Sequence, residues 1–415
     1  MNPIDRNCDV LVVGAGIVGA ACAWRLAREG LQVTLIDAGC GGAGATAEGM
    51  GHLVILDDSP AQLALTRHSL DLWSELAPEL AEGCEFRRSG TLWLAETDED
   101  LANLEAKAAL YAGHGLAHEL LDGDELRRRE PNLAPRLPGA LAVPGDAVVY
   151  PPRVTTELIA RAQRDHGLVW RPNTPIAEVA SDGDSGARVR TTDGACWRAG
   201  HVVLAAGHRS FELLDELPPG LSLTPRKGHL LITARHPGFC RHQLVEVGYL
   251  RSAHGHGDED TSGSGLPAGT SVAFNLQPRP NGQMLLGSSR QHGEASRTIE
   301  RALVAAMVRR SLDFVPGLAE LAAIRIWTGL RAATPDPLPY LGPLPGQPRV
   351  LLATGHEGLG ITTSLVSAEL IADHLLERPS AIPREPYDPA RHLRTVLPAG
   401  ASGPTLELAT PEIAP

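Results

Sequence analysis

Three glycines near the N-terminus have the spacing that most directly predicts chemistry. Gly14-Ala-Gly16-Ile-Val-Gly19 follows an apolar run, and Asp37 lies eighteen residues beyond Gly19. In such a turn the first glycine permits the tight bend, the second lets backbone approach a pyrophosphate, and the third lets helix and strand pack closely. The acidic residue accepts hydrogen bonds from ribose hydroxyls and would repel a 2′-phosphate. The spacing therefore predicts a dinucleotide site that disfavours NADP.

The elements that must position these glycines form one βαβ unit. The apolar run 9–14 predicts a buried strand, 20–29 a helix and 31–36 a second strand. A loop of small residues over 39–51 follows, where an NAD-dependent dehydrogenase would continue directly with further βα units. The sequence therefore favours one binding domain assembled from distant segments.

Two later segments repeat the pattern of an apolar strand that enters a glycine, at 201–207 and 349–355. Leu and Ala at helical spacing predict further helices, and β-branched runs between turn residues predict short strands. A polar segment at 254–265 is expected to be a surface loop. The predicted helices are 59–82, 97–114, 153–166, 299–313 and 361–376, and the predicted strands fall within 168–206 and 222–290.

Composition excludes several classes of protein. The formal net charge is −12, only two of the 37 basic residues are lysine, and the longest basic run is Arg127-Arg128-Arg129, so nucleic acid is not an expected partner. No apolar stretch has the length of a membrane-spanning helix. Six scattered cysteines without a Cys-x-x-Cys pair indicate neither a disulfide framework nor a metal site, and they favour a cytoplasmic location.

Five motifs in a fixed order resemble the FAD-dependent D-amino-acid oxidase (DAO) superfamily over residues 8–378. They are the segments 14–37, 45–52, 202–207, 329–342 and 354–362. Within the superfamily, residues 44–73 and the phrase Gly355-His-Glu-Gly-Leu-Gly-Ile-Thr-Thr most resemble bacterial D-hydroxyproline dehydrogenases and opine oxidase β subunits. The resemblance implies non-covalent FAD, because no cysteine follows Cys240 to tether it. An FMN at a subunit interface is not part of this expectation.

The resemblance implies an α/β fold: a discontinuous Rossmann-like FAD-binding domain with an interleaved α+β substrate domain built on a mixed sheet. The expected FAD-binding domain comprises 1–75, 151–215 and 325–395, the substrate domain 76–150 and 216–324, and a flexible tail 396–415.

The resemblance and the chemistry of the residues together give a set of cofactor contacts. Glycines in the last motif would let backbone pass close to the isoalloxazine ring, and the helix that follows would stabilise negative charge on the reduced ring. The backbone of Ile176 matches the position that holds the adenine. The expected cofactor-binding residues are Gly14, Gly16, Ile17, Val18, Gly19, Asp37, Ala38, Gly44, Ala45, Thr46, Met50, Gly51, His52, Ile176, Ala205, Ala206, Gly207, Arg331, Gly355, His356, Glu357, Gly358, Leu359, Gly360, Ile361 and Thr362.

Arg331, in Gly-Leu-Arg, matches the family arginine that holds the substrate carboxylate, a task that suits a guanidinium fork better than a lysine. Arg290 and His52 are further candidates for contact with substrate or flavin. Glycine oxidase has another arginine where this chain has Gly358, which argues against glycine as the substrate.

The resemblance implies hydride transfer from the C–N bond of a D-amino or cyclic imino acid, of the D-hydroxyproline or D-proline type, to flavin N5. The expected partner is a small amine that carries a carboxylate. Two alternatives stay open. One is an FAD-bearing β subunit of an opine or sarcosine oxidase or dehydrogenase that passes electrons to partner subunits, a quinone or a dye, and the other is a non-catalytic flavin-binding protein.

Overall fold

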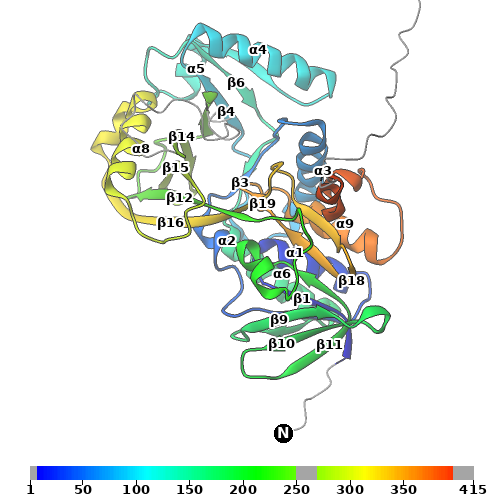
Figure 1. Cartoon of the computed structure of the whole chain (residues 1–415). Coiled ribbons are helices and arrows are strands. Elements are labelled where there is room, and N and C mark those ends of the chain that lie inside the picture. The colour runs from blue at the N-terminus through cyan, green and yellow to red at the C-terminus, as the bar shows by residue number, and fades with distance from the viewer. Residues whose placement is uncertain (1–6, 249–268, 396–415) are drawn as a thin grey trace, which may run out of the picture.

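The computed structural model describes residues 7–248 and 269–395, which form two large β-sheets with helices against them (Figure 1). The polar segment predicted at 254–265 and the tail predicted at 396–415 lie outside the described residues. The expected mixed α/β fold is confirmed.

The eight-stranded sheet contains the N-terminal dinucleotide motif. Its path is β17-β18-β11-β1-β2-β8, and β10 and β9 extend from β11. β1 pairs in parallel with both β2 and β11, which explains why its sequence is a continuous apolar run. The strands are β1 (Asn7–Val13), β2 (Val33–Ile36), β8 (Val169–Arg171), β9 (Ile176–Ser181), β10 (Ala187–Thr191), β11 (Cys196–Leu204), β17 (Tyr340–Leu344) and β18 (Gln347–Thr354).

Helices bury one face of this sheet. α1 (Ile17–Arg28) lies between α6 (Pro151–His166) and α9 (Ser364–Leu375), and its small and apolar residues enter the same core as Val10 and Val12 of β1. α3 (Pro60–Leu76) packs against α9. Helices from both ends of the chain therefore form one layer against this sheet. The two later apolar strands that end in a glycine, at 201–207 and 349–355, predict such an assembly from distant segments.

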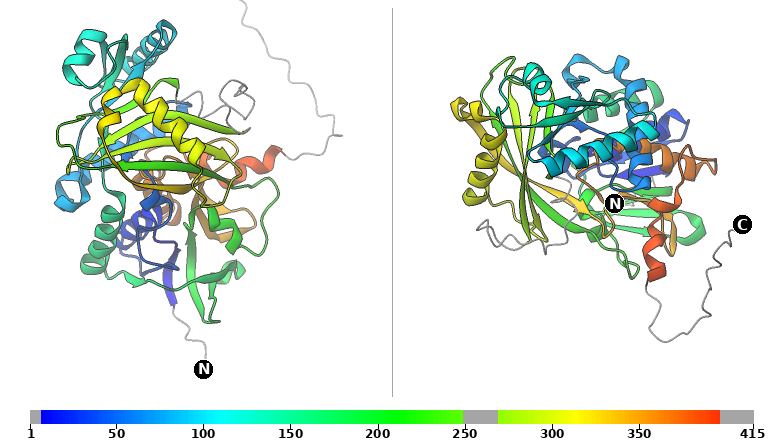
Figure 2. Two further views of the ribbon diagram at one scale, coloured as in Figure 1. Left: turned by 90° about the vertical axis from the view of Figure 1, so that its left-hand side faces the viewer. Right: turned by 90° about the horizontal axis from the view of Figure 1, so that it is seen from above.

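The nine-stranded sheet is mostly antiparallel, in the order β19-β16-β12-β15-β14-β13-β4-β6-β5. α8 (Arg301–Phe314) covers one face of this sheet (Figure 2). There Phe314 stacks on Phe274, with ring centroids 4.7 Å apart. The strands are β4 (Thr91–Ala95), β5 (Glu119–Asp122), β6 (Gly139–Val143), β12 (Thr224–Thr233), β13 (Gln243–Glu246), β14 (Thr270–Pro278), β15 (Met284–His292), β16 (Ala323–Ala333) and β19 (His356–Glu357).

Local sequence signals account for several helix ends. α4 (Asp98–Gly113) begins with a capping box formed by Thr97 and Asp100, and α6 ends at Gly167, which has φ 71°. The helix predicted at 59–82 is shorter: α3 ends at Leu76, and a 3₁₀ turn that contains Pro78 follows. The remaining short elements are α2 (Ala45–Glu48), α5 (Gly123–Arg129), β3 (His52–Leu53) and β7 (Ala147–Val148).

The strand β16 crosses one predicted domain boundary. Most of β16 falls within 325–395, the segment expected in the FAD-binding domain. However, β16 pairs with β12 and β19 pairs with β16, so both strands belong to the nine-stranded sheet. The cause is long-range strand pairing, which local sequence does not report. The expected domain boundaries otherwise stay predictions.

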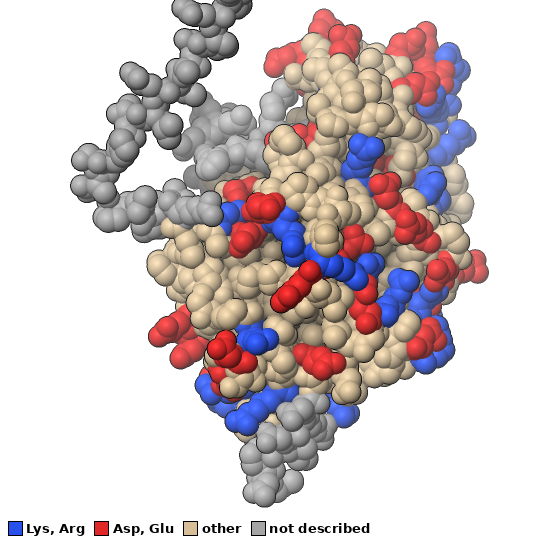
Figure 3. Space-filling model, turned by 90° about the vertical axis from the view of Figure 1, so that its right-hand side faces the viewer, with Lys and Arg blue, Asp and Glu red and all other residues tan. Residues whose placement is uncertain are grey.

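On the face shown in Figure 3, acidic and basic side chains are interspersed. Within 7–248 and 269–395, no helix combines the length and the apolar character needed to cross a membrane. All six cysteines are free thiols.

Candidate functional site

A cavity of about 520 Å³ extends from the N-terminal motif to the nine-stranded sheet. Its walls include residues at the carboxyl ends of β1, β2, β11 and β18 on one side and residues of β12 and β16 on the other. In open α/β sheets ligands bind at the carboxyl ends of parallel strands, so the cavity lies where the fold predicts a dinucleotide.

The glycine motif forms a close-packed turn at one end of this cavity. Gly14 has φ 102°, and a Cβ there would lie 2.5 Å from the carbonyl oxygen of Ala205. A Cβ on Gly19 would lie 1.8 Å from the Gly14 carbonyl oxygen. Both positions therefore require glycine, as the sequence predicts. α1 begins at Ile17 beside the cavity. Its N-cap residue is Gly16, so no side chain of the N-cap residue occupies the first backbone N–H groups of the helix.

Asp37 closes the turn from the end of β2. Its two carboxylate oxygens accept the backbone N–H groups of Ala15, at 2.6 Å, and Gly39, at 2.7 Å. An ionised carboxylate has about four acceptor positions, so these bonds leave room for ribose hydroxyls. Asp37 lines the cavity, consistent with its expected role.

The loop 44–52 links the glycine turn to the other half of the cavity. The hydroxyl of Thr46 accepts the N–H of Ile17 at 3.0 Å, which fixes α2 beside the start of α1. His52 is tied to the C-terminal motif, because the Thr362 hydroxyl donates to the His52 carbonyl at 2.9 Å. Burial lowers the pKa of His52 to about 4, so its imidazole is neutral at pH 7. Among the described residues, His52 Nε2 has no hydrogen-bond partner.

The C-terminal motif supplies backbone to the middle of the cavity. Gly355 has φ 82°, and a Cβ there would lie 2.5 Å from a methyl carbon of Thr334. Burial lowers the pKa of His356 to about 4, and its Nε2 lies 2.9 Å from the Ser367 hydroxyl. The helix predicted from residue 361 begins only at Ser364, because residues 361–363 form turns. Its N-terminus is therefore one turn further along the chain than expected.

Arg331 projects from β16 into the same cavity. Its Nη1 donates to the Ser289 carbonyl at 3.3 Å. A Cβ on Gly228 would lie 2.7 Å from Nη1 of Arg331, and one on Gly358 would lie 3.7 Å from its Nε. The guanidinium of Arg331 therefore lies against β12 at Gly228, where the Cβ of any other residue would collide with it.

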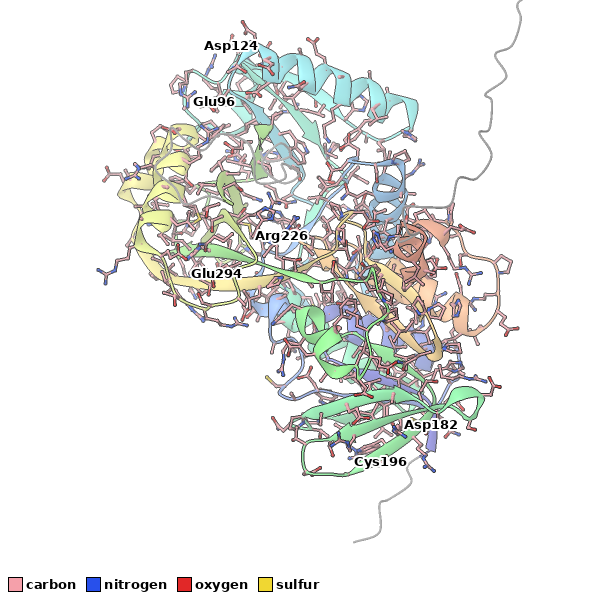
Figure 4. The ribbon with its side chains drawn as sticks, viewed as in Figure 1. Glu96, Asp124, Asp182, Cys196, Arg226 and Glu294 are labelled. Atoms are coloured by element: carbon pink, nitrogen blue, oxygen red, sulfur yellow. The ribbon has the colours of Figure 1, made fainter. Side chains whose placement is uncertain are left out.

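Glu357 joins Arg331 to two further arginines. Its Oε1 lies 3.6 Å from Arg226 Nη1 and 3.6 Å from Arg290 Nε. Burial alone would raise the pKa of Glu357, but the positive charges of Arg290, Arg331 and Arg226 outweigh burial and bring the pKa to about 2. The carboxylate is therefore ionised throughout the physiological range. Figure 4 labels Arg226 near the centre of the view, and its side chain is 15% exposed.

Most of the expected contacts line the cavity. Five do not. Gly19 and Gly51 pack against backbone, Thr362 bonds to His52, Leu359 packs against an apolar cluster, and Arg290 pairs with Glu357. The expected residues on the wall are Gly14, Gly16, Ile17, Val18, Asp37, Ala38, Gly44, Ala45, Thr46, Met50, His52, Ile176, Ala205, Ala206, Gly207, Arg331, Gly355, His356, Glu357, Gly358, Gly360 and Ile361.

The sequence motifs predict Arg290 of β15, but they do not predict the other residues that β12 and β15 bring to the site. Gly228, Leu230 and Ser288 line the cavity. Arg226 faces Glu357 from the same strand as Gly228. In the sequence, the only sign of Arg226 is a basic residue two positions before Gly228 in an apolar strand, which is weak evidence for a site residue. Arg226 is placed beside Arg331 only by the register between β12 and β16.

The cavity suits FAD on the observations above: a turn at which a Cβ would collide with backbone, a carboxylate at the second strand, and backbone loops that continue to Arg331. The fold and the site thus define an FAD-dependent oxidoreductase. Residues 9–374 match the family described as DAO, FAD dependent oxidoreductase, and the chain belongs to this family.

Relatives with known activities span nearly the whole chain. A glycine oxidase of Pseudomonas aeruginosa is 29% identical over 92% of this chain and 99% of its own. A D-amino acid dehydrogenase of Xylella fastidiosa is 27% identical over 94% and 97%. The crystal structure of glycine oxidase from Geobacillus kaustophilus superposes with a TM-score of 0.80 at 27% identity, over 93% of this chain and 99% of that one. The chain is accordingly an FAD-dependent enzyme that acts on C–N bonds of amino acids.

Proposed function

We propose that this enzyme oxidises the C–N bond of a D-amino or cyclic imino acid, of the D-hydroxyproline or D-proline type, with Arg331 as the residue that binds the substrate carboxylate. Arg331 carries the proposal: it is a charged side chain that projects from the nine-stranded sheet into the cavity whose other end has the dinucleotide turn. A guanidinium can donate two parallel hydrogen bonds to a carboxylate, which fixes orientation as well as position.

The chemistry that FAD supplies when bound is acceptance of a hydride from the substrate α-carbon, as the amine becomes an imine. The protein's part is orientation. Arg331 would fix the carboxylate, and with it the direction of the α-hydrogen, in a cavity walled by the C-terminal loop. Leu230 and Met50 would exclude water from the apolar part of the same wall.

Three ionisable side chains of this wall, those of Glu357, His52 and His356, are poorly suited to deprotonate the substrate ammonium. Glu357 has a pKa of about 2, and His52 and His356 each have a pKa of about 4, so all three are poor bases at pH 7. The substrate amine would therefore enter in its neutral form, and the carboxylate of Glu357 would stabilise the positive charge that develops on nitrogen.

Gly358 supports a substrate other than glycine. The resemblance to glycine oxidases implies an arginine in those enzymes at the position of Gly358, so the residues nearest Arg331 would differ here. A relative named D-amino acid dehydrogenase supports the wider class. A role as the FAD-bearing β subunit of an opine or sarcosine oxidase stays a prediction, and so does a non-catalytic role.

The test is anaerobic mixing of the purified FAD-containing protein with D-hydroxyproline, D-proline, N-methylglycine, opines and glycine. The proposal expects the visible flavin absorption to bleach with a D-proline-type acid and not with glycine. Bleaching by glycine alone would contradict the substrate class. Flavin that no amine reduces would favour the non-catalytic role. Co-purifying subunits and negligible oxygen use by the isolated chain would favour the β-subunit role.

A further inference from the structure

One amide side chain on the cavity wall has an oxygen without a partner. Asn275 of β14 is 5% exposed and lines the cavity. Among the described residues, its Oδ1 makes no hydrogen bond. An unpaired acceptor inside a protein is costly, and most buried polar atoms therefore have a partner. The unpaired Oδ1 indicates that a bound molecule supplies a donor at this point of the wall.

The alternation of side chains along β14 explains why Asn275 points to the cavity. Its neighbours Phe274 and Leu276 pack in the core beneath α8, on the opposite face of the sheet. Gln277 lies on the same face as Asn275, and its Oε1 accepts the backbone N–H of Gly51 at 2.8 Å. The amide oxygen of Gln277 thus has a partner within the protein, whereas that of Asn275 is left for a ligand.

Apolar side chains lie beside Asn275. Its partners in the sheet are Val245 of β13 and Gly287 of β15. A Cβ on Gly287 would lie 2.7 Å from a methyl carbon of Leu230 and 3.6 Å from the sulfur of Met50, and both of these side chains line the cavity. A hydrogen bond to Asn275 would therefore form in surroundings of low polarity, where it is strong and where its absence is most costly.

Strand register places Asn275 close to Arg331. Nη1 of Arg331 donates to the Ser289 carbonyl at 3.3 Å, so the guanidinium reaches across β12 to β15. Ser289 is two residues from Gly287, the residue opposite Asn275. Such diagonal neighbours on a sheet lie about 7–8 Å apart. A small substrate whose carboxylate is held by Arg331 can therefore extend its other end to Asn275.

A hydroxyl at that far end fits Asn275 better than the substrate amine does. The amine and the carboxylate share the α-carbon, so the amine stays close to Arg331, where Glu357 also lies. A hydroxyl further along the substrate donates its O–H to an amide oxygen and can also accept from an amide N–H. An asparagine side chain offers both groups.

We propose that Asn275 selects a substrate that carries a hydroxyl, by accepting a hydrogen bond from it at Oδ1 while Arg331 holds the carboxylate. This inference rests on the proposed function, because Arg331 must first fix the carboxylate. Within that function it favours a D-hydroxyproline over D-proline. A substrate without the hydroxyl would leave Oδ1 buried and unpaired, and a site built to bond a hydroxyl rejects such an analogue.

Two matched pairs of compounds test the selection. Both epimers of 4-hydroxy-D-proline are compared with D-proline, and D-homoserine is compared with D-norvaline, in which a methyl group replaces the hydroxyl. We expect kcat/KM for anaerobic flavin reduction to be at least roughly tenfold higher for the hydroxylated member of one pair. Values that agree within about twofold in both pairs would overturn the inference.

Variants of Asn275 show whether this residue causes the preference. Asn275→Leu removes the amide at similar volume, and the ratio of the two kcat/KM values should fall by roughly tenfold. Asn275→Asp keeps an acceptor oxygen of the same shape and should retain most of the ratio. Asn103→Leu, at an exposed position of α4, is the matched control and should retain the wild-type ratio. Should Asn275→Leu lose FAD, the Asp variant and the wild-type pairs still decide.

The inference and the proposed function fail differently. If no amine that bears a carboxylate reduces the flavin, the proposed function is wrong. If both members of each pair reduce it equally well, or if Asn275→Leu lowers kcat/KM by the same factor for both members, the function stands and the hydroxyl site is wrong. An equal loss for both members is the result expected if Oδ1 instead accepts an N–H of the substrate amine or of the flavin.

Discussion

Arg226 and Arg331 stand directly opposite each other in the antiparallel pairing of β12 and β16, and both lie near the ionised carboxylate of Glu357. Two like charges at one register position are unfavourable in a sheet unless something compensates them. Glu357 compensates in part, and the substrate carboxylate that we propose at Arg331 would add a second negative charge. This pairing is consistent with our proposal that Arg331 binds a substrate carboxylate.

Replacement of Arg331 by lysine should weaken substrate use without loss of the cofactor. Lysine keeps the charge but cannot form two parallel bonds to a carboxylate, and we expect kcat/KM to fall by roughly 100-fold. Anaerobic flavin reduction measures the effect, and Arg325→Lys on the same strand is the control. Unchanged kcat/KM in Arg331→Lys would remove Arg331 from substrate binding.

Gly228→Ala should displace Arg331. The new Cβ would lie 2.7 Å from Arg331 Nη1 and 2.8 Å from the Ser289 carbonyl oxygen, so the guanidinium must move. A displacement of about 1 Å in a positioning group lowers kcat/KM by up to about 100-fold. Gly113→Ala is the matched control, because a Cβ there meets no atom within 4 Å. Full activity in Gly228→Ala would show that the Arg331 position does not matter.

Gly19→Ala should abolish tight FAD binding. Its Cβ would lie 1.8 Å from the Gly14 carbonyl oxygen, which forces the turn apart where the pyrophosphate is expected. The FAD retained per chain after gel filtration, read from the visible spectrum, reports the loss. Gly145→Ala, which meets no atom within 4 Å, should retain FAD fully. A yellow Gly19→Ala protein with normal stoichiometry would contradict the assignment of this turn.

Two histidines beside the cavity should make the protein less stable in mild acid. His52 and His356 each have a folded pKa of about 4, below the ordinary 6.5, so their contribution is present above pH 6.5 and is lost as pH falls toward 4. Each should lower the free energy of unfolding by about 2 kcal/mol between pH 7 and pH 5. Urea unfolding at both pH values measures the loss.

The variant His356→Gln isolates one of these contributions. Asp146 works in the opposite direction, since burial raises its pKa to about 7 and its contribution grows as pH falls. The comparison of wild type with His356→Gln cancels that effect. A pH dependence identical in the two proteins would show that His356 does not stay neutral in the fold.

The ion pair between Lys227 and Glu300 should contribute to the stability of the nine-stranded sheet behind the site. Lys227 is fully buried, and its Nζ lies 3.0 Å from a carboxylate oxygen of Glu300. Glu300→Gln would leave the ammonium without that carboxylate, and because Glu300 is one-third exposed we expect a loss of roughly 2 kcal/mol in the free energy of unfolding. Glu320→Gln, at an exposed position, should have no such effect. Equal stability of the two variants would contradict the ion pair.

The sequence predicted the parts of the site that depend on local geometry. The Gly14–Gly19 turn, Asp37 and the strand-into-glycine segments have spacing that reflects backbone requirements within one βα unit. Arg331 was recognised by its motif. Each of these lines the cavity except Gly19, which packs beneath it.

What the sequence could not show depends on long-range pairing. Arg226 is 105 residues before Arg331, and only the register of β12 with β16 places them opposite each other. Glu357 was expected as part of a backbone loop, and its role as a counter-ion follows from the pairing of β19 with β16. Lys227, one of two lysines in the chain, is part of the same sheet. Its side chain points to the face away from the cavity and pairs with Glu300.

The most direct test of the central claim compares an acid with its decarboxylated analogue. In anaerobic stopped-flow mixing, D-proline should bleach the flavin and pyrrolidine should not, because only the acid can be oriented by Arg331. In Arg331→Lys the reduction by D-proline should slow by roughly 100-fold. Equal reduction by the two amines in the wild-type protein, or a wild-type rate in Arg331→Lys, would contradict the account.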